Sequence, residues 1–264
     1  MKTLIANSMA AARDLRLLGL HFVVNLLLIG GATLWLIIPD KHAAQLVFTA
    51  LFALVLVAVA IWLHAGTLSY TSEIDGGMFA RFWRGMRHAA AFVVVVAVMV
   101  YLATKCAGLD DRMGQISGYV YFKVPSVLRS PVGPDRFEKV GSSVLGIVSY
   151  YLIPALLLPF AAAGARFGLG KGMLFGAVNA LKNGLYWVWF GILLILGVWV
   201  PLQLIDWAPR RTLTVEAVSM VIRFTIAYLL VVLSWLAVAG MLGSLVAADS
   251  GPGADVSGKP VPQP

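Results

Sequence analysis

The chain has 264 residues, of which 60% are hydrophobic and 12% are charged, and its mean hydropathy is +0.89. Soluble domains carry about a quarter charged residues, so the composition excludes an ordinary soluble protein and predicts an all-α polytopic membrane protein. The formal charge of +8 fits the basic loops of membrane proteins, and we predict no nucleic-acid partner. A single cysteine, Cys106, excludes an intramolecular disulfide and a thiolate metal cage.

Apolar runs of the length that crosses a bilayer as a helix, about 20 residues, occur six times. We predict one membrane domain, residues 1–247, with spans at about 17–38, 44–66, 89–107, 143–163, 185–205 and 217–246. Pro154 and Pro159 are predicted to kink the fourth span. Residues 108–142 are predicted to form an outer loop, and the Gly- and Pro-rich residues 248–264 a disordered cytoplasmic tail.

The basic residues set the predicted topology. If the N-terminus is inside, three inner segments each carry three basic residues close to span ends, whereas the outer basic residues lie mostly in the long loop 108–142. Short basic segments orient spans more strongly than long loops do. We therefore predict both termini in the cytoplasm and a multi-pass location in the cell membrane, specifically a bacterial inner membrane.

Two segments of similar pattern each precede an apolar run: "GGMFARFWRGMRH" at 76–88 and "KGMLFGAVNALKN" at 171–183. The first has a helical apolar stripe of Met78, Phe79, Phe82, Trp83 and Met86, and all matching positions of the second are apolar. Each is predicted to be an amphipathic helix in the inner interface, with its basic face on the lipid headgroups. The order span, interfacial helix, span thus occurs twice, and "AAARDLRLLG" before the first span is a weaker third example. Chance amphipathicity of an inner loop is the alternative.

The connections "RFWRGMRHAAAF" and "GAVNALKNGLYW" resemble those of a diffuse group of six-span bacterial membrane proteins. That group includes the membrane region found beside glycerophosphodiester phosphodiesterase domains. The resemblance covers the second to fifth spans and implies a six-span fold. No catalytic domain follows the last span in this sequence, so the resemblance implies no activity.

Two histidines, His21 and His64, lie at similar depth in the first two spans when counted from the hairpin near Lys41. Two facing histidines can ligate a haem axially. The alternative is that both are merely polar residues near the interface. Because no second pair and no attachment motif supports a haem, we predict no cofactor and keep a haem-binding redox protein as the least favoured function.

Two further polar residues interrupt apolar runs. Asn25 lies one turn beyond His21 on the same face, and we favour a packing hydrogen bond for it over a transport site. Arg223 lies inside the sixth span, near its outer end. We favour snorkelling of Arg223 to the surface over an ion pair with Asp206 or Glu216.

Catalytic patterns are missing from the sequence: no paired carboxylates within a span, no "HExxH", no P-loop and no "GxSxG". We therefore predict a non-enzymatic membrane organising or interaction protein without a metal site. Its predicted partners are the bilayer and an anionic lipid or a protein at the cytoplasmic face. The predicted contact residues are Arg81, Arg84, Arg87 and Lys182. A small-solute transporter is the alternative, because repeated span–helix–span units with kinked helices recur in transporters.

Overall fold

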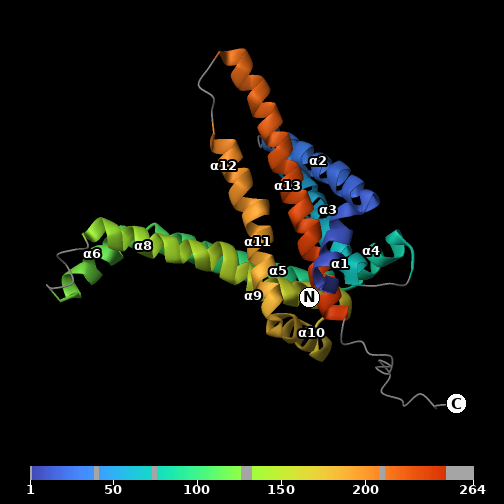
Figure 1. The fold of residues 1–264 in the computed structure, drawn as a ribbon. Coiled ribbons are helices and arrows are strands. Elements are labelled where there is room, and N and C mark those ends of the chain that lie inside the picture. Colours follow the sequence, from blue (N-terminus) through green and yellow to red (C-terminus); the bar gives the residue numbers. More distant parts are fainter. Residues whose placement is uncertain (1, 39–41, 73–75, 126–132, 208–211, 248–264) are drawn as a thin grey trace. The chain divides into compact units, whose positions relative to one another are not determined.

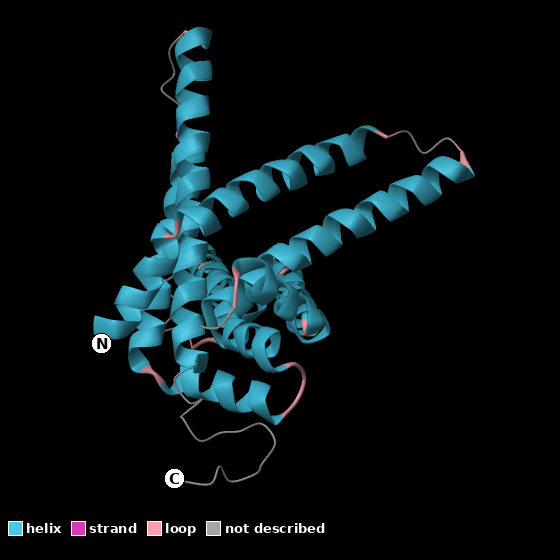
Figure 2. Ribbon diagram, turned by 90° about the vertical axis from the view of Figure 1, so that its right-hand side faces the viewer, coloured by secondary structure: helices cyan, strands magenta, loops and turns pink. Residues whose placement is uncertain are grey.

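The computed structural model describes residues 2–38, 42–72, 76–125, 133–207 and 212–247. This part of the chain is helical and contains no β-strand, as Figures 1 and 2 show. The predicted tail, residues 248–264, lies outside the described residues. The all-α fold class predicted from composition is confirmed.

Six helical stretches in the described residues are long and apolar enough to cross a membrane, so the prediction of a six-span polytopic protein is confirmed. The predicted spans fall on these stretches in order. Four stretches are uninterrupted: α2 (Leu15–Ile37), α3 (Ala43–Ser72), α5 (Ala89–Asp110) and α13 (Leu213–Ala247). The fourth span consists of α8 (Pro134–Ile147), η1 (Val148–Leu152) and α9 (Ile153–Phe167). The fifth consists of α11 (Gly184–Leu194), η2 (Ile195–Trp199) and α12 (Val200–Asp206).

The two composite spans contain π-helical turns, and each of these turns ends just before a proline. Pro154 follows η1 and Pro201 follows η2, in both cases by two residues. A proline has no N–H and its ring pushes against the carbonyl four residues earlier, and a wider π-turn accommodates both effects. Pro159, by contrast, lies inside α9, which continues through it.

Three short helices each lead directly into a span. They are α1 (Lys2–Arg13), α4 (Met78–Arg87) and α10 (Lys171–Lys182), and they precede α2, α5 and α11. Each ends on a basic residue, which complements the negative end of the helix dipole. One residue then separates the two helices: Asp14, His88 and Asn183. The order of short helix and span therefore occurs three times in the described residues.

The chain divides into two compact units, Met1–Val93 with Pro159–Pro264, and Val94–Leu158. In the second unit, α6 (Met113–Lys123) packs on α8, where Gly141 makes room for the Met113 side chain. The rings of Tyr121 and Phe137 meet edge to face at 6.0 Å. Residues 108–142, predicted as an outer loop, thus contain the end of α5, all of α6 and the start of α8.

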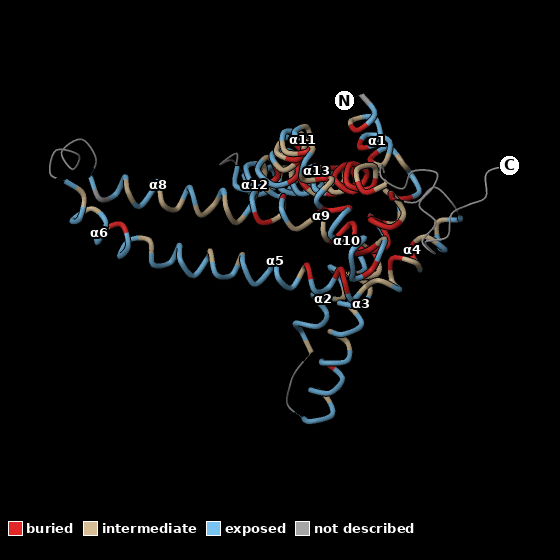
Figure 3. The backbone as a smooth tube through the Cα atoms, turned by 90° about the horizontal axis from the view of Figure 1, so that it is seen from below, coloured by how far each residue is buried: buried red, intermediate tan, exposed pale blue. Residues whose placement is uncertain are grey.

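The core of the first unit forms around the C-terminal half of α13, where Figure 3 shows the buried residues gathered. Small residues let the helix backbones approach closely there, as is typical of helix packing in membranes. A Cβ added at Gly243 would collide with the Thr71 carbonyl of α3, and one at Gly240 would collide with Ala11 of α1. This close packing occurs at the end of these spans where α1, α4 and α10 lie. We call this end the short-helix end.

Candidate functional site

Helix α1 lies across α13 at the short-helix end and is joined to it by a buried serine. Ser8 Oγ donates a hydrogen bond of 2.8 Å to the carbonyl of Ala237 and accepts one of 2.9 Å from Trp189 Nε1 of α11. The Ser8 side chain has no exposed surface. One hydroxyl therefore connects α1, α11 and α13.

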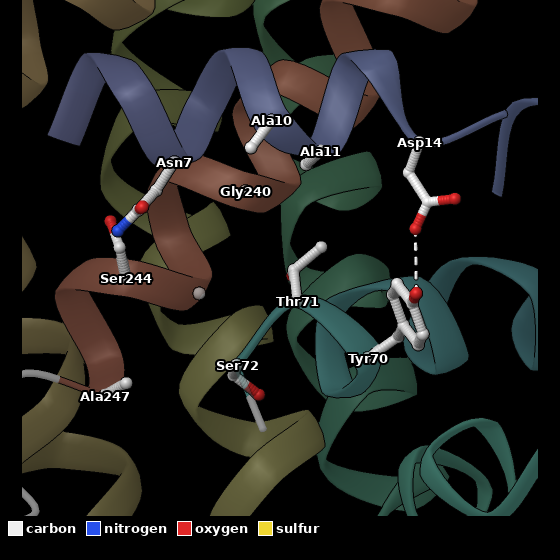
Figure 4. A pocket seen from close by; sticks show the side chains of 11 residues that line it. Asn7, Ala10, Ala11, Asp14, Tyr70, Thr71, Ser72, Gly240, Ser244 and Ala247 are labelled. Atoms are coloured by element: carbon white, nitrogen blue, oxygen red, sulfur yellow. Dashed lines mark hydrogen bonds between the residues drawn. The ribbon is translucent and has the colours of Figure 1, made fainter. Parts of the chain in front are cut away.

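A cavity of about 510 Å³ lies beneath α1, between it and the ends of α3 and α13. Figure 4 shows Asn7 and Ser244 on one side and the bonded pair Asp14 and Tyr70 on the other. Thr71 and Ser72 lie between these two sides. The cavity is therefore bordered by hydroxyl, amide and carboxylate groups from three helices.

Most of these polar groups are already bonded within the protein. Asp14 accepts from the backbone N–H groups of Arg16 and Leu17 at 3.0 and 3.3 Å and caps α2, and its other oxygen accepts from Tyr70 Oη at 2.7 Å. Thr71 donates to the Ala239 carbonyl at 2.9 Å. The carboxylate and this hydroxyl thus hold helices together.

A second cavity, of about 470 Å³, adjoins the first and shares Asn7 and Ser244 with it. Asn183, the residue between α10 and α11, lines this cavity, and its side-chain oxygen accepts from the Leu185 N–H at 3.0 Å. Two of the three residues that separate a short helix from its span, Asp14 and Asn183, therefore border this pair of cavities and cap the span that follows.

Helix α4 is held to α3 by one face and leaves large aromatic residues uncovered on another. Phe82 is buried against Gly66, and Gly85 lies on the Ala65 carbonyl. Phe79 and Trp83 are 78% and 61% exposed. The predicted apolar stripe thus divides into a protein-facing part and an outward-facing part.

The predicted contact residues of α4 differ in how far the protein engages them. Arg81 donates to the Gly76 and Tyr70 carbonyls at 2.8 and 3.4 Å, and its guanidinium lies 5.1 Å from the centre of the Tyr70 ring. Arg84 is half-buried, whereas Arg87 is exposed. Lys182, the last residue of α10, is also exposed. The structure therefore leaves Arg87 and Lys182 as the more accessible pair.

Helix α10 repeats the division seen in α4. Gly176, Ala177 and Ala180 are buried, and Gly176 packs near Ala163 of α9 and Val246 of α13. Leu174 and Phe175 are 55% and 65% exposed. Both short helices therefore attach to the bundle by a face of small residues or a single aromatic ring, and both present large apolar side chains outward.

The two histidines of the predicted pair are brought together. The ring centres of His21 and His64 are 5.9 Å apart, and the His64 ring meets Trp235 of α13 edge to face at 5.2 Å. His21 is fully buried, and its Nε2 lies 2.8 Å from Thr67 Oγ1. Because the single Thr67 hydroxyl hydrogen is donated to the Leu63 carbonyl at 2.7 Å, the hydroxyl accepts from His21 Nε2–H, which leaves Nδ1 as the bare nitrogen.

This arrangement does not fit an axial pair for haem. An axial histidine uses a bare ring nitrogen directed at the iron, and a macrocycle must fit between the two rings. Here the imidazoles of His21 and His64 lie in direct contact, 5.9 Å apart and tilted by 56°, and leave no space for a macrocycle between them. The cluster is instead a buried polar contact among α2, α3 and α13.

The other two intramembrane polar residues also have defined surroundings. Asn25 is half-buried, and its side chain makes no hydrogen bond with another described residue, so the predicted packing hydrogen bond is not seen. Arg223 Nη1 donates to the Leu204 and Ile205 carbonyls at 3.2 and 3.1 Å, and its guanidinium lies 5.7 Å from the Trp207 ring centre. Within the described residues Arg223 therefore caps the C-terminal end of α12, a role that neither snorkelling nor an ion pair had predicted.

Sequence reasoning did not find the residues of the cavities beneath α1. The available signals were Asp14 directly before an apolar run and the polar run "SYTS" at the end of the second span. Asn7 and Ser244 carry no such signal, because they meet at the cavities only through contacts between the two ends of the chain.

The described residues contain no group of three or more His, Cys, Asp or Glu side chains that could hold a metal ion. Comparison with protein-family models, curated proteins and solved structures found no match to this chain. The fold and the site therefore define its class, a six-span α-helical membrane protein with three short helices at one end, and the resemblance noted in the sequence stays a prediction.

Proposed function

We propose that this protein is a non-enzymatic membrane organising protein that gathers anionic lipid at its short-helix end, which faces the cytoplasm. The observation that carries the proposal is the division of α4: Phe82 and Gly85 fix it to α3 while Phe79 and Trp83 project outward. Aromatic side chains beside basic ones are typical of the membrane–water interface. A helix fixed in this way can contact lipid headgroups with its basic residues and the adjoining acyl chains with its aromatic residues.

The exposed basic residues supply the electrostatic part of this function. Arg87 and Lys182 end the two short helices, and each basic residue near an anionic leaflet contributes about 1 kcal/mol of attraction. A protein partner at the same face is the competing role. We favour lipid because the exposed residues of both helices are large and apolar as well as basic.

The test is lipid selectivity of the full chain reconstituted in bilayers. Spin-labelled phosphatidylglycerol and phosphatidylcholine report how much of each lipid is motionally restricted by the protein. We expect a preference for phosphatidylglycerol that weakens with salt and falls several-fold in the double variant Arg87→Gln with Lys182→Gln. Lys105→Gln with Arg112→Gln, which removes two exposed charges near the other end of α5, is the matched control. Equal restriction of both lipids by the wild-type protein would refute the proposal.

A small-solute transporter is the second candidate, and the π-helical turns favour it. π-turns often mark functional irregularities in helices, and η2 lies beside α13, where Gly197 adjoins Ser234. Flux of a small solute into vesicles that contain the protein, together with unchanged lipid selectivity in the double variant, would replace our proposal with this one.

A further inference from the structure

A groove of about 330 Å³ lies between α2, α3 and α4. Its walls are apolar: Val23 and Leu20 come from α2, Trp62 from α3, and Phe79 and Phe82 from α4. The rings of Trp62 and Phe82 are 5.2 Å apart and tilted by 49°. Because Phe82 is fixed against Gly66, the groove has a rigid aromatic wall.

The groove is open at Gly19, and Arg16 lies at one end of it. Gly19 is exposed, and a Cβ added there would meet no atom within 4 Å, so the notch in α2 exists because this residue has no side chain. Arg16 is exposed, and its guanidinium makes no hydrogen bond or ion pair with another described residue. From Arg16 to Val23 the helix rises about 10 Å, from the short-helix end into the apolar span.

We propose that this groove binds one anionic phospholipid, with the phosphate at Arg16 and an acyl chain along Gly19 and Val23. This inference rests on the proposed function and names one specific site within it. Charge complementarity supports the occupant: the groove combines one unpaired guanidinium with an otherwise apolar lining, which matches a charged headgroup joined to a hydrocarbon chain. Asp14, the nearby carboxylate, accepts hydrogen bonds from Tyr70 and from the start of α2, and not from the Arg16 guanidinium.

The experiment is native mass spectrometry of the full chain in detergent, titrated with phosphatidylglycerol or phosphatidylcholine of identical chains. We expect one tight phosphatidylglycerol adduct with an affinity roughly fivefold above that of phosphatidylcholine, the factor that one basic residue near an anionic headgroup provides. Arg16→Gln should bring this ratio close to one. Gly19→Leu should fill the notch and weaken the tight adduct of either lipid by about tenfold or more.

Two matched variants control the test. Gly30→Leu makes the same change at another exposed position of α2 where an added Cβ also meets nothing, and Arg13→Gln removes an exposed charge of α1 that does not line the groove. Both should bind lipid as the wild type does. An unchanged adduct in Gly19→Leu, or an unchanged lipid ratio in Arg16→Gln, overturns the inference.

The two proposals fail in different ways. If the bilayer experiment shows a phosphatidylglycerol preference but Gly19→Leu binds like the wild type, the groove is not the site and the organising function stands. If the bilayer preference is absent while the groove variants lose the single adduct, the protein holds one lipid without gathering others.

Discussion

The hydroxyl of Ser8 donates to the carbonyl of Ala237 across 229 residues of sequence and so ties the N-terminal helix α1 to the last span. The same oxygen accepts from the indole of Trp189. This bond joins α1, which covers the cavities of the short-helix end, to α13.

Ser8→Ala should lower the free energy of unfolding by about 1–2 kcal/mol, because the Trp189 N–H loses its partner in a buried place. Unfolding by sodium dodecyl sulfate titration, followed by circular dichroism, measures the change. Ser143→Ala is the control, since Ser143 is bonded only within its own helix, to the Lys139 carbonyl, at an exposed site. A Ser8 variant as stable as the control would contradict this role.

Gly243→Ala should destabilise the first unit by about 1–3 kcal/mol, because the added methyl group collides with the Thr71 carbonyl and forces α13 and α3 apart. Gly30→Ala, where the methyl group meets no neighbouring atom, should be neutral or slightly stabilising through helix propensity. The same unfolding titration compares the two. Equal effects of the two substitutions would show that α13 does not approach α3 this closely.

The full chain, purified from cells supplied with a haem precursor, should show no Soret band. The His21 and His64 rings lie against each other, 5.9 Å apart, without room for a macrocycle between them. A visible spectrum makes the measurement. A Soret band that disappears in His64→Ala would restore the haem-binding redox protein as a function.

Arg223→Lys should make the C-terminal end of α12 less stable than in the wild type. Snorkelling requires only a long side chain with a charge, which lysine provides, whereas donation to Leu204 and Ile205 uses the geometry of the guanidinium. In the lysine variant we expect faster amide hydrogen exchange in residues 200–207. We also expect the free energy of unfolding to fall by about 1 kcal/mol. Exchange identical to that of the wild type would favour the snorkelling interpretation.

The fold class, the six spans and the short helices that precede the third and fifth spans could be predicted from the amino-acid sequence. Each of these depends on residues that are close in the chain. A run of about 20 apolar residues must form a helix in lipid. An apolar stripe of helical period can be recognised in a segment of about ten residues. Similar reasoning placed His21 and His64 at one depth, because both were counted from the same hairpin.

The groups that each side chain contacts, by contrast, depend on how the helices pack. In α4, Phe82 packs on Gly66, whereas Phe79 and Trp83 are exposed. The apolar stripe could not predict this difference, because a hydropathy pattern does not distinguish between apolar residues that contact protein and those that do not. Arg223 donates hydrogen bonds to carbonyl groups about twenty residues away, and Ser8 donates one to a carbonyl group near the other end of the chain. Hydropathy adds up local contributions, whereas hydrogen-bond partners, cavities and the lipid groove arise from the packing of helices that are distant in sequence.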